Sequence, residues 1–129
     1  MKLIISSILI GLVSTSLIAC TVDPTPKPQK SIQEKMSQLD KETKALIGSA
    51  SCTTNKQCHG IGFGDKACGG FMSFRVYSDQ NTDISQLKKT VDRYNKLSEQ
   101  WNRENNIVST CDYLMPPQLN CKQQTCQIK

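Results

Sequence analysis

The sequence predicts a small α+β domain stapled by disulfides, with a short antiparallel sheet packed by one long amphipathic helix and an additional N-terminal helix. Three observations lead to this fold class. Six of the seven cysteines fall between Cys52 and Cys126. Apolar residues recur every three or four positions over residues 84–101, as on one face of a helix. Apolar and polar residues alternate over residues 71–77, as in a half-buried strand.

Composition bounds the size and class of the protein. A chain of 129 residues, of which 37% are hydrophobic and 5% aromatic, has room for one small domain with a modest core. Domains of this size commonly depend on disulfides or a metal for stability. The formal charge is +5, and residues of both signs are interspersed without a basic stripe or interleaved aromatic residues. We therefore expect no nucleic-acid partner.

Residues 1–19 have the features of a secretory signal peptide. Lys2 gives a positively charged start, and residues 3–19 contain no charged side chain. This apolar stretch suits the core of a secretory signal better than a membrane span, which needs about 20 residues. An uncleaved membrane helix is the alternative. The prolines that follow at alternate positions count against it, because they prevent a helix.

The quartet Leu17-Ile18-Ala19-Cys20 resembles the lipobox of bacterial lipoproteins, which has an aliphatic residue, a tolerant position, a small residue and a cysteine. The resemblance implies attachment of diacylglycerol to the Cys20 sulfur, cleavage before Cys20 and acylation of the new amino terminus. Several acyl chains anchor a protein firmly, since each buried CH₂ adds about 0.8 kcal/mol. Thr21 stands where an aspartate typically retains a lipoprotein in the inner membrane. The resemblance therefore implies the outer membrane, with the domain facing the periplasm.

In this interpretation residues 20–30 are a lipidated Pro-rich stalk, and residues 31–129 are a periplasmic cysteine-rich α+β domain. Alternating prolines hold the stalk near polyproline II geometry, with a rise of about 3.1 Å per residue. Ser31 and Glu34 match a capping box, which predicts a helix over residues 31–48. That helix either docks on the domain through its apolar stripe or remains separate and pairs with a partner helix.

The long amphipathic helix is predicted over residues 83–105, with Thr82 or Asp83 as its cap. Tyr94 and Trp101 lie on its apolar face, and they are interpreted as core anchors, with a ligand platform as the alternative. The strand candidates are residues 57–63, 71–77, 119–121 and 126–128, the last two joined by a turn over residues 122–125.

Six cysteines remain once Cys20 is assigned to the anchor. They are Cys52, Cys58, Cys68, Cys111, Cys121 and Cys126. In an oxidising compartment they should form three disulfides, for which about fifteen pairings exist. The two groups of three flank the long helix. We expect at least one bridge between the groups, with Cys121 or Cys126 as a member, and the spacing leaves the pairs open.

The sequence carries no convincing signature of a metal, cofactor or catalytic site. Zinc sites typically have paired cysteines two to four residues apart, and a thioredoxin-like site needs Cys-x-x-Cys. The glycine-rich residues 60–64 open no helix, as a phosphate-binding loop must, and they are interpreted as one crowded side of a strand. We expect no metal, no small-molecule cofactor and no enzyme activity. The alternative is an enzyme that uses His59, the sole histidine. Its nucleophile would be one of three serines, Ser51, Ser73 or Ser109.

The body of the chain resembles small cysteine-rich envelope lipoproteins of proteobacteria. The likeness lies in the alternating-glycine strand, the Cys-Gly-Gly turn at residues 68–70 and the closing Cys-x4-Cys. We therefore expect a membrane-anchored envelope lipoprotein with a non-catalytic binding or structural role, acting on an envelope protein partner. The alternative is an inhibitor of a secreted or periplasmic hydrolase, a protease or lysozyme. The candidate binding loops contain Gly69, Gly70, Phe71, Met72, Tyr113, Leu114 and Met115.

The substitution Cys20→Ser tests the anchor. It should abolish palmitate labelling, because the thioether needs the Cys20 thiol, while the other six cysteines keep their three disulfides. Metabolic labelling and a non-reducing peptide map measure the two results. Labelling that survives the substitution would mean that the leader has been misread.

Overall fold

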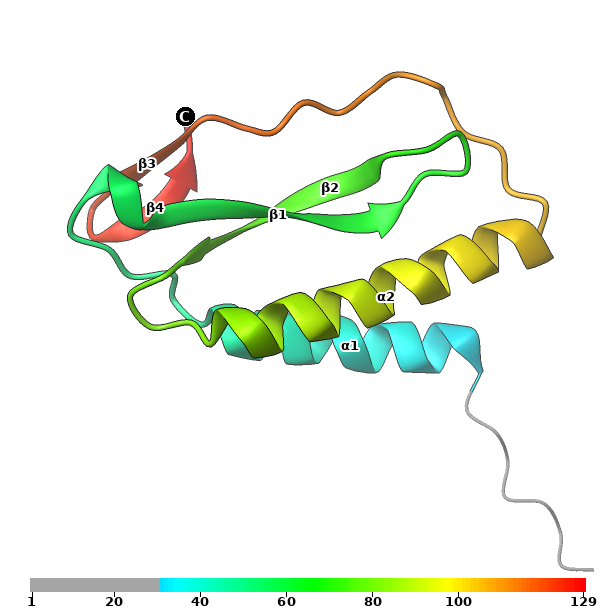
Figure 1. Ribbon diagram of the computed structural model, residues 1–129, viewed down its shortest axis with the longest axis horizontal. Coiled ribbons are helices and arrows are strands. Elements are labelled where there is room, and N and C mark those ends of the chain that lie inside the picture. Colours follow the sequence, from blue (N-terminus) through cyan, green and yellow to red (C-terminus); the bar gives the residue numbers. More distant parts are fainter. Residues whose placement is uncertain (1–30) are drawn as a thin grey trace, which may run out of the picture.

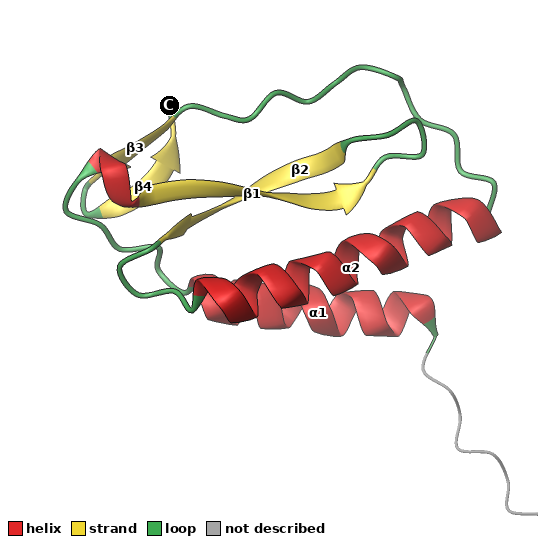
Figure 2. Cartoon of the chain, in the orientation of Figure 1, coloured by secondary structure: helices red, strands yellow, loops and turns green. Residues whose placement is uncertain are grey.

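The computed structural model describes residues 31–129, which form two α-helices, a two-stranded sheet and a smaller two-stranded sheet (Figures 1 and 2). The predicted signal peptide, the lipidation site Cys20 and the stalk lie outside the described residues. The predicted fold class, a small disulfide-stapled α+β domain, is confirmed. Within residues 31–129, neither helix combines the length and the apolar character that a membrane crossing requires.

Helix α1 (Ile32–Ile47) begins and ends where its capping residues predict. The Ser31 hydroxyl accepts a hydrogen bond from the Glu34 main-chain N–H at 3.2 Å, and the Glu34 carboxylate accepts one from the Ser31 N–H at 3.0 Å. Gly48 ends the helix at φ +57°, a conformation that glycine adopts without steric cost.

Helix α2 (Ile84–Glu104) supplies much of the core. The Asp83 carboxylate caps it by accepting a hydrogen bond from the Gln86 N–H at 2.9 Å. Leu87 and Val91 are fully buried in a cluster with aromatic residues of the sheet. Burial of each such side chain contributes about 1.5–3 kcal/mol.

The two helices lie side by side beneath the larger sheet and run in opposite directions (Figure 1). Leu39 and Thr43 of α1 are buried. The Glu42 carboxylate of α1 accepts a hydrogen bond from the Thr90 hydroxyl of α2 at 3.0 Å. The N-terminal helix therefore docks on the domain.

Strands β1 (Cys58–Asp65) and β2 (Phe71–Ser78) form an antiparallel hairpin above the helices (Figure 2). Phe63 and Tyr77 belong to the same buried cluster as Leu87 of α2. The helix-facing side of the hairpin thus closes the main core.

The other side of β1 lacks side chains at three alternate positions, Gly60, Gly62 and Gly64. The Phe71 ring fills the space above Gly62, where an added β carbon would lie 2.2 Å from the nearest ring atom. At Gly60 a β carbon would meet its nearest neighbours at 3.8 Å, which is ordinary contact. The structure thus bears out the interpretation of a crowded strand side at Gly62 but not at Gly60.

Strands β3 (Leu119–Lys122) and β4 (Thr125–Ile128) form the second antiparallel hairpin. Gln123 and Gln124 make its turn at φ +51° and +59°. Positive φ at both central turn residues matches the right-handed twist of the flanking strands. A short 3₁₀ helix, η1 (Asn55–Gln57), precedes β1 and packs near this hairpin.

All three disulfides join the first group of cysteines to the second. The pairs are Cys52–Cys121, Cys58–Cys126 and Cys68–Cys111. The expected bridge between the groups is confirmed. The bonded residues lie 69, 68 and 43 positions apart, so each bridge removes up to about 4 kcal/mol of loop entropy from the unfolded chain.

The substitution Gly62→Ala tests the crowded side. Its new methyl group would overlap the Phe71 ring, so we expect the free energy of unfolding to fall by about 1–3 kcal/mol. Chemical denaturation monitored by circular dichroism measures the change. Gly60→Ala is the matched control on the same strand face and should cost less than about 1 kcal/mol. Equal losses in the two variants would contradict the packing of Phe71 on Gly62.

Candidate functional site

The two predicted binding loops meet at the tip of the β1–β2 hairpin. Gly69 and Gly70 form the hairpin turn with φ +104° and +86°. A β carbon on Gly70 would lie 3.7 Å from the Tyr113 ring, which belongs to the other loop. Residues 105–118 link α2 to β3 and cross the hairpin on the side away from the helices (Figure 1). The fold thus brings together loops that are distant in sequence.

One disulfide and three polar contacts fix this crossing segment to the hairpin tip. Cys68 of the tip is bonded to Cys111, and its main-chain N–H donates to the Ser109 hydroxyl at 3.0 Å. The Lys66 ammonium donates to the Asp112 main-chain carbonyl at 2.7 Å and to the Asp112 carboxylate at 3.1 Å. The Lys66 side chain is only 13% exposed. The position of the segment is therefore set by covalent and hydrogen-bonded contacts.

The Asp112 carboxyl is held in its charged form. Hydrogen bonds from the Thr110 side chain and then from Lys66 lower the pKa of Asp112 below its ordinary value of 3.8. Because the folded-state pKa is the lower one, this stabilisation is present above about pH 3.8 and is lost as the pH falls through the folded-state pKa. The Asp112 side chain is 69% exposed, so solvent screens its ion pair. The Cys68–Cys111 disulfide therefore contributes most to holding the crossing segment at the hairpin tip.

Six exposed apolar side chains gather at this junction, and we call them the hairpin-tip surface. They are Phe71, Met72, Ile107, Tyr113, Leu114 and Met115, with exposed fractions between 39% and 71%. Contiguous exposed apolar side chains of this kind mark interaction sites on soluble proteins. Aromatic residues and methionine are also enriched at protein interfaces. Ile107 is the member that the sequence did not single out.

A cavity of about 240 Å³ lies within the hairpin-tip surface. Phe71, Met72, Ile107 and Leu114 contribute its apolar wall, and Lys66 is among its polar lining residues. Ligand pockets for small molecules usually measure about 300–1,000 Å³. This cavity suits a single anchoring side chain better than a free ligand.

Polar side chains of α2 close the outer edge of β1. These are Asn95, Ser98 and Asn102. The Asn95 amide accepts from the Gly64 N–H at 2.7 Å and donates to the Gly62 carbonyl at 3.1 Å. The Ser98 hydroxyl accepts from the Asp65 N–H at 3.0 Å, and Asn102 donates to the Asp65 carbonyl at 2.7 Å. This role was not predicted from the sequence. Its signal is a row of small polar residues, three and four positions apart, beside the apolar face.

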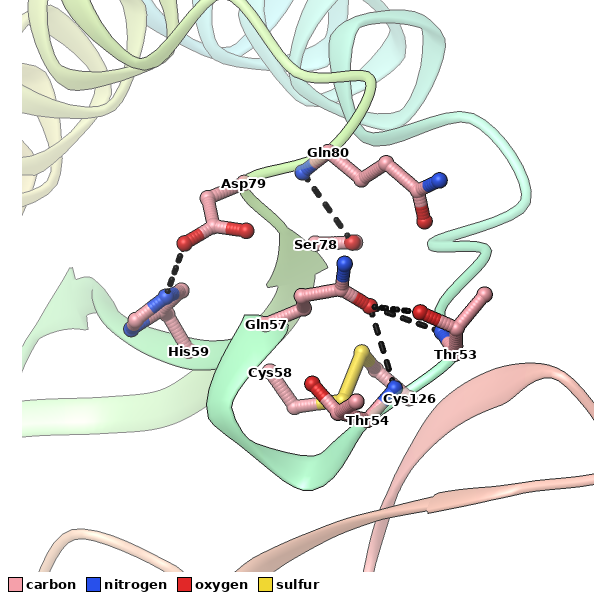
Figure 3. A network of polar contacts seen from close by, with 9 residues as sticks. All are labelled: Thr53, Thr54, Gln57, Cys58, His59, Ser78, Asp79, Gln80 and Cys126. Atoms are coloured by element: carbon pink, nitrogen blue, oxygen red, sulfur yellow. Dashed lines mark hydrogen bonds and ion pairs between the residues drawn. A yellow bond between two sulfur atoms is a disulfide. The ribbon is translucent and has the colours of Figure 1, made fainter.

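His59 lies away from this surface, at the end of the hairpin where β1 begins and β2 ends. Its Nε2 is 2.9 Å from an Asp79 carboxylate oxygen, and the two side chains point toward each other (Figure 3). Its ring centroid is 5.5 Å from that of Tyr77. The neighbouring Gln57 side chain accepts hydrogen bonds from Thr53. This network secures the start of β1.

The structure does not bring together His59 and the three serines considered as its nucleophile. The Ser51 hydroxyl accepts from the Asn81 amide at 2.7 Å. The Ser73 hydroxyl donates to the Phe63 carbonyl at 3.3 Å. The third, Ser109, binds at the hairpin tip. Each serine therefore forms a hydrogen bond that stabilises the segment in which it lies.

Three buried cysteine sulfurs lie within 4.8 Å of one another, in a grouping that could suit a metal. They belong to Cys52, Cys58 and Cys126. All three take part in disulfides. Zinc binds the thiolate form of cysteine, so the oxidised chain offers no zinc ligand from this group.

Comparison with known proteins does not assign the chain to a family. No protein-family model, curated protein or solved structure matches it. Function must therefore be inferred from the residues themselves, and the hairpin-tip surface is the strongest candidate among those that the structure describes.

The double substitution Cys68→Ser/Cys111→Ser tests the tie at the hairpin tip. The free energy of unfolding should fall by about 2–4 kcal/mol, because the unfolded chain regains loop entropy. Amides of residues 107–114 should also exchange with solvent faster in the native state, which hydrogen-exchange mass spectrometry measures. The control is Cys52→Ser/Cys121→Ser, which should change the exchange rates of residues 107–114 less than the first variant does. Unchanged exchange in the first variant would show that the polar contacts alone position the segment.

Proposed function

We propose that the chain is a lipid-anchored protein of the bacterial cell envelope that binds a partner protein through the hairpin-tip surface. The observation that carries the proposal is the gathering of six exposed apolar side chains on a junction held by Cys68–Cys111. The leader and the quartet ending at Cys20 support the anchor. Thr21 favours the outer membrane, with residues 31–129 on the periplasmic side.

The chemistry of the surface favours a protein partner. Met72, Tyr113 and Met115 are 63–71% exposed, so they present much of their apolar area to solvent. A partner side chain that entered the cavity would contact the apolar wall of Phe71, Met72, Ile107 and Leu114, and polar groups such as Asn102 and Ser109 also line the cavity. This arrangement is typical of the few residues that dominate interface energies. The proposed role is non-catalytic and assigns no part to His59.

The position of the surface suits an anchored protein. The chain enters the described domain at Ser31, in the helical layer, and the crossing segment lies on the opposite side of the hairpin (Figure 1). The hairpin tip lies at the same end of the domain as the start of α1, with the helical layer between them (Figure 1), so a partner can approach the hairpin-tip surface from the face of the hairpin that is away from the helices.

A second candidate is an inhibitor of a secreted or periplasmic hydrolase. Tyr113 and Met115 project from a segment that Cys68–Cys111 and the Lys66 contacts hold in place. A loop that is already ordered loses little entropy when it enters an active-site cleft. Assays of proteases and lysozymes with the protein at micromolar concentration test this candidate, and full activity across the panel would remove it.

The double substitution Tyr113→Ser/Met115→Ser tests the binding surface. Recovery of the partner from a detergent-solubilised envelope fraction should fall about tenfold or more, because interface anchors of this type carry about 2 kcal/mol or more each. Quantitative mass spectrometry of cross-linked complexes measures the recovery. Ile128→Ser is the control, since Ile128 is 57% exposed but lies on β4, at the other end of the molecule. A partner retained by the double variant, or lost equally by the control, would contradict the proposal.

A further inference from the structure

The two outer edges of the β1–β2 hairpin differ in whether side chains of α2 bond to their main-chain groups. Asn95, Ser98 and Asn102 of α2 occupy the edge of β1 by bonding its main-chain groups. An open strand edge presents unpaired N–H and C=O groups that can pair with another chain, so proteins usually cover or block it.

The register of the hairpin shows which main-chain groups face that edge. Gly62 pairs with Phe74, and Gly60 pairs with Val76. The Gly62 carbonyl points away from β2, since it bonds to Asn95. In an antiparallel pair, facing residues that do not exchange hydrogen bonds direct their N–H and C=O groups outward on both strands. The main-chain groups of Phe74 and Val76 therefore point to the outer edge of β2.

Within residues 31–129, no main-chain group from beyond the hairpin bonds to these groups. Among the hydrogen bonds of residues 31–129 that lie outside helices and strand pairs, none involves the main chain of Phe74 or Val76. The open edge thus offers two N–H donors and two carbonyl acceptors, spaced two residues apart. An extended peptide backbone carries the complementary groups at the same spacing.

Recesses lie on both sides of this open edge. On the helix side, a groove of about 380 Å³ runs between α1 and β2, and its walls include Met36, Asp40, Arg75, Tyr94 and Trp101. On the other side, β2 begins at Phe71 and Met72, which belong to the hairpin-tip surface. Successive side chains of a strand point to opposite faces. A strand added to β2 would therefore place alternate side chains in the groove and toward the hairpin-tip surface.

We propose that an extended segment of the partner protein adds to β2 as a third strand, pairing with Phe74 and Val76. This proposal rests on the proposed function, because it names how the partner is bound. The backbone of the segment supplies hydrogen bonds, and its alternate side chains supply selectivity. In this mode Tyr94 and Trp101 serve as the wall of a binding groove as well as packing residues.

The charges in the groove define the side chains that it accepts. The Arg75 guanidinium lies 2.8 Å from the Asp40 carboxylate, and it also stacks 4.4 Å above the centre of the Phe63 ring. Lys44 also pairs with Asp40, at 2.6 Å, so the three side chains together carry one net positive charge. The groove therefore favours an uncharged or acidic side chain over a basic one beside Met36 and Trp101. A basic side chain there would lose water and meet charges of its own sign.

The same charges argue against a second copy of this chain as the occupant. If β2 of another molecule were the added strand, its helix-side residues, Ser73, Arg75 and Tyr77, would face the groove. Its Arg75 would then approach the Arg75 already present, and like charges on neighbouring strands are destabilising. The partner segment is therefore assigned to a different protein.

Selection of peptides and hydrogen exchange test the strand addition. The acylated full chain in detergent micelles is used to select from a phage-displayed library of random linear peptides. The selected peptides should carry apolar residues at alternate positions. A saturating synthetic copy should slow amide exchange at Phe74 and Val76 by about tenfold or more, as expected for newly formed strand hydrogen bonds. Exchange at Gly64, whose N–H already bonds to Asn95, should not change.

A pair of variants isolates the main-chain contact. Phe74→Pro removes the outward N–H, whereas Phe74→Ala removes the ring and keeps the N–H. The proline variant should bind the selected peptide at least about tenfold more weakly than the alanine variant. A disulfide map and a thermal melt verify that both variants fold. If Phe74→Pro does not fold, exchange at Phe74 and Val76 in the unmodified chain decides the question.

The outcomes separate this proposal from the proposed function. A peptide that binds the hairpin-tip surface but leaves exchange at Phe74 and Val76 unchanged would overturn the strand addition alone. Protection of these amides that appears without peptide and grows with protein concentration would assign the edge to a second copy of the chain, and would also overturn it. Failure to select any peptide, together with no partner lost on Tyr113→Ser/Met115→Ser, would overturn both.

Discussion

The bridges between the two groups of cysteines are the constraint on which the rest of the structure depends. The chain after α2 contains one crossing segment and one short hairpin, and it adds little to the main core that α2 forms with the larger sheet. Cys52–Cys121 and Cys58–Cys126 hold the β3–β4 hairpin beside the start of β1. Cys68–Cys111 holds the crossing segment at the other end. Covalent links thus replace the apolar burial that so small a chain cannot provide.

Helix α2 gives the hairpin two unlike edges. Its apolar face buries Leu87 and Val91, and its neighbouring polar face bonds to the main chain of β1. The opposite edge, on β2, stays open between a groove and an exposed apolar surface. Rigid walls on both sides of an open edge lower the entropy cost of ordering a bound segment. The proposed binding mode follows from this asymmetry.

Local interactions explain why much of the fold could be predicted from the sequence. A capping box at Ser31 and a cap at Asp83 involve residues within three positions, so the helix starts are visible in the sequence. The alternation over residues 71–77 and the glycines of residues 60–64 likewise indicate strands that pack on one side. The cysteine count predicted the number of bridges. The structure places the two candidate binding loops side by side at the hairpin tip, and their role in binding stays a prediction.

The sequence by itself determined the helices, the strands, the even set of cysteines after Cys20 and the bridge between its two groups. Only the tertiary structure decided which cysteines pair, because pairing depends on distances between segments up to 69 positions apart. It also decided that Gly70 and Tyr113 meet, which made one surface of two loops. The sequence likewise did not show that Asn95 covers the outer edge of β1 or that the outer edge of β2 stays uncovered. Both depend on which strand lies next to α2, and contacts between distant segments set that position.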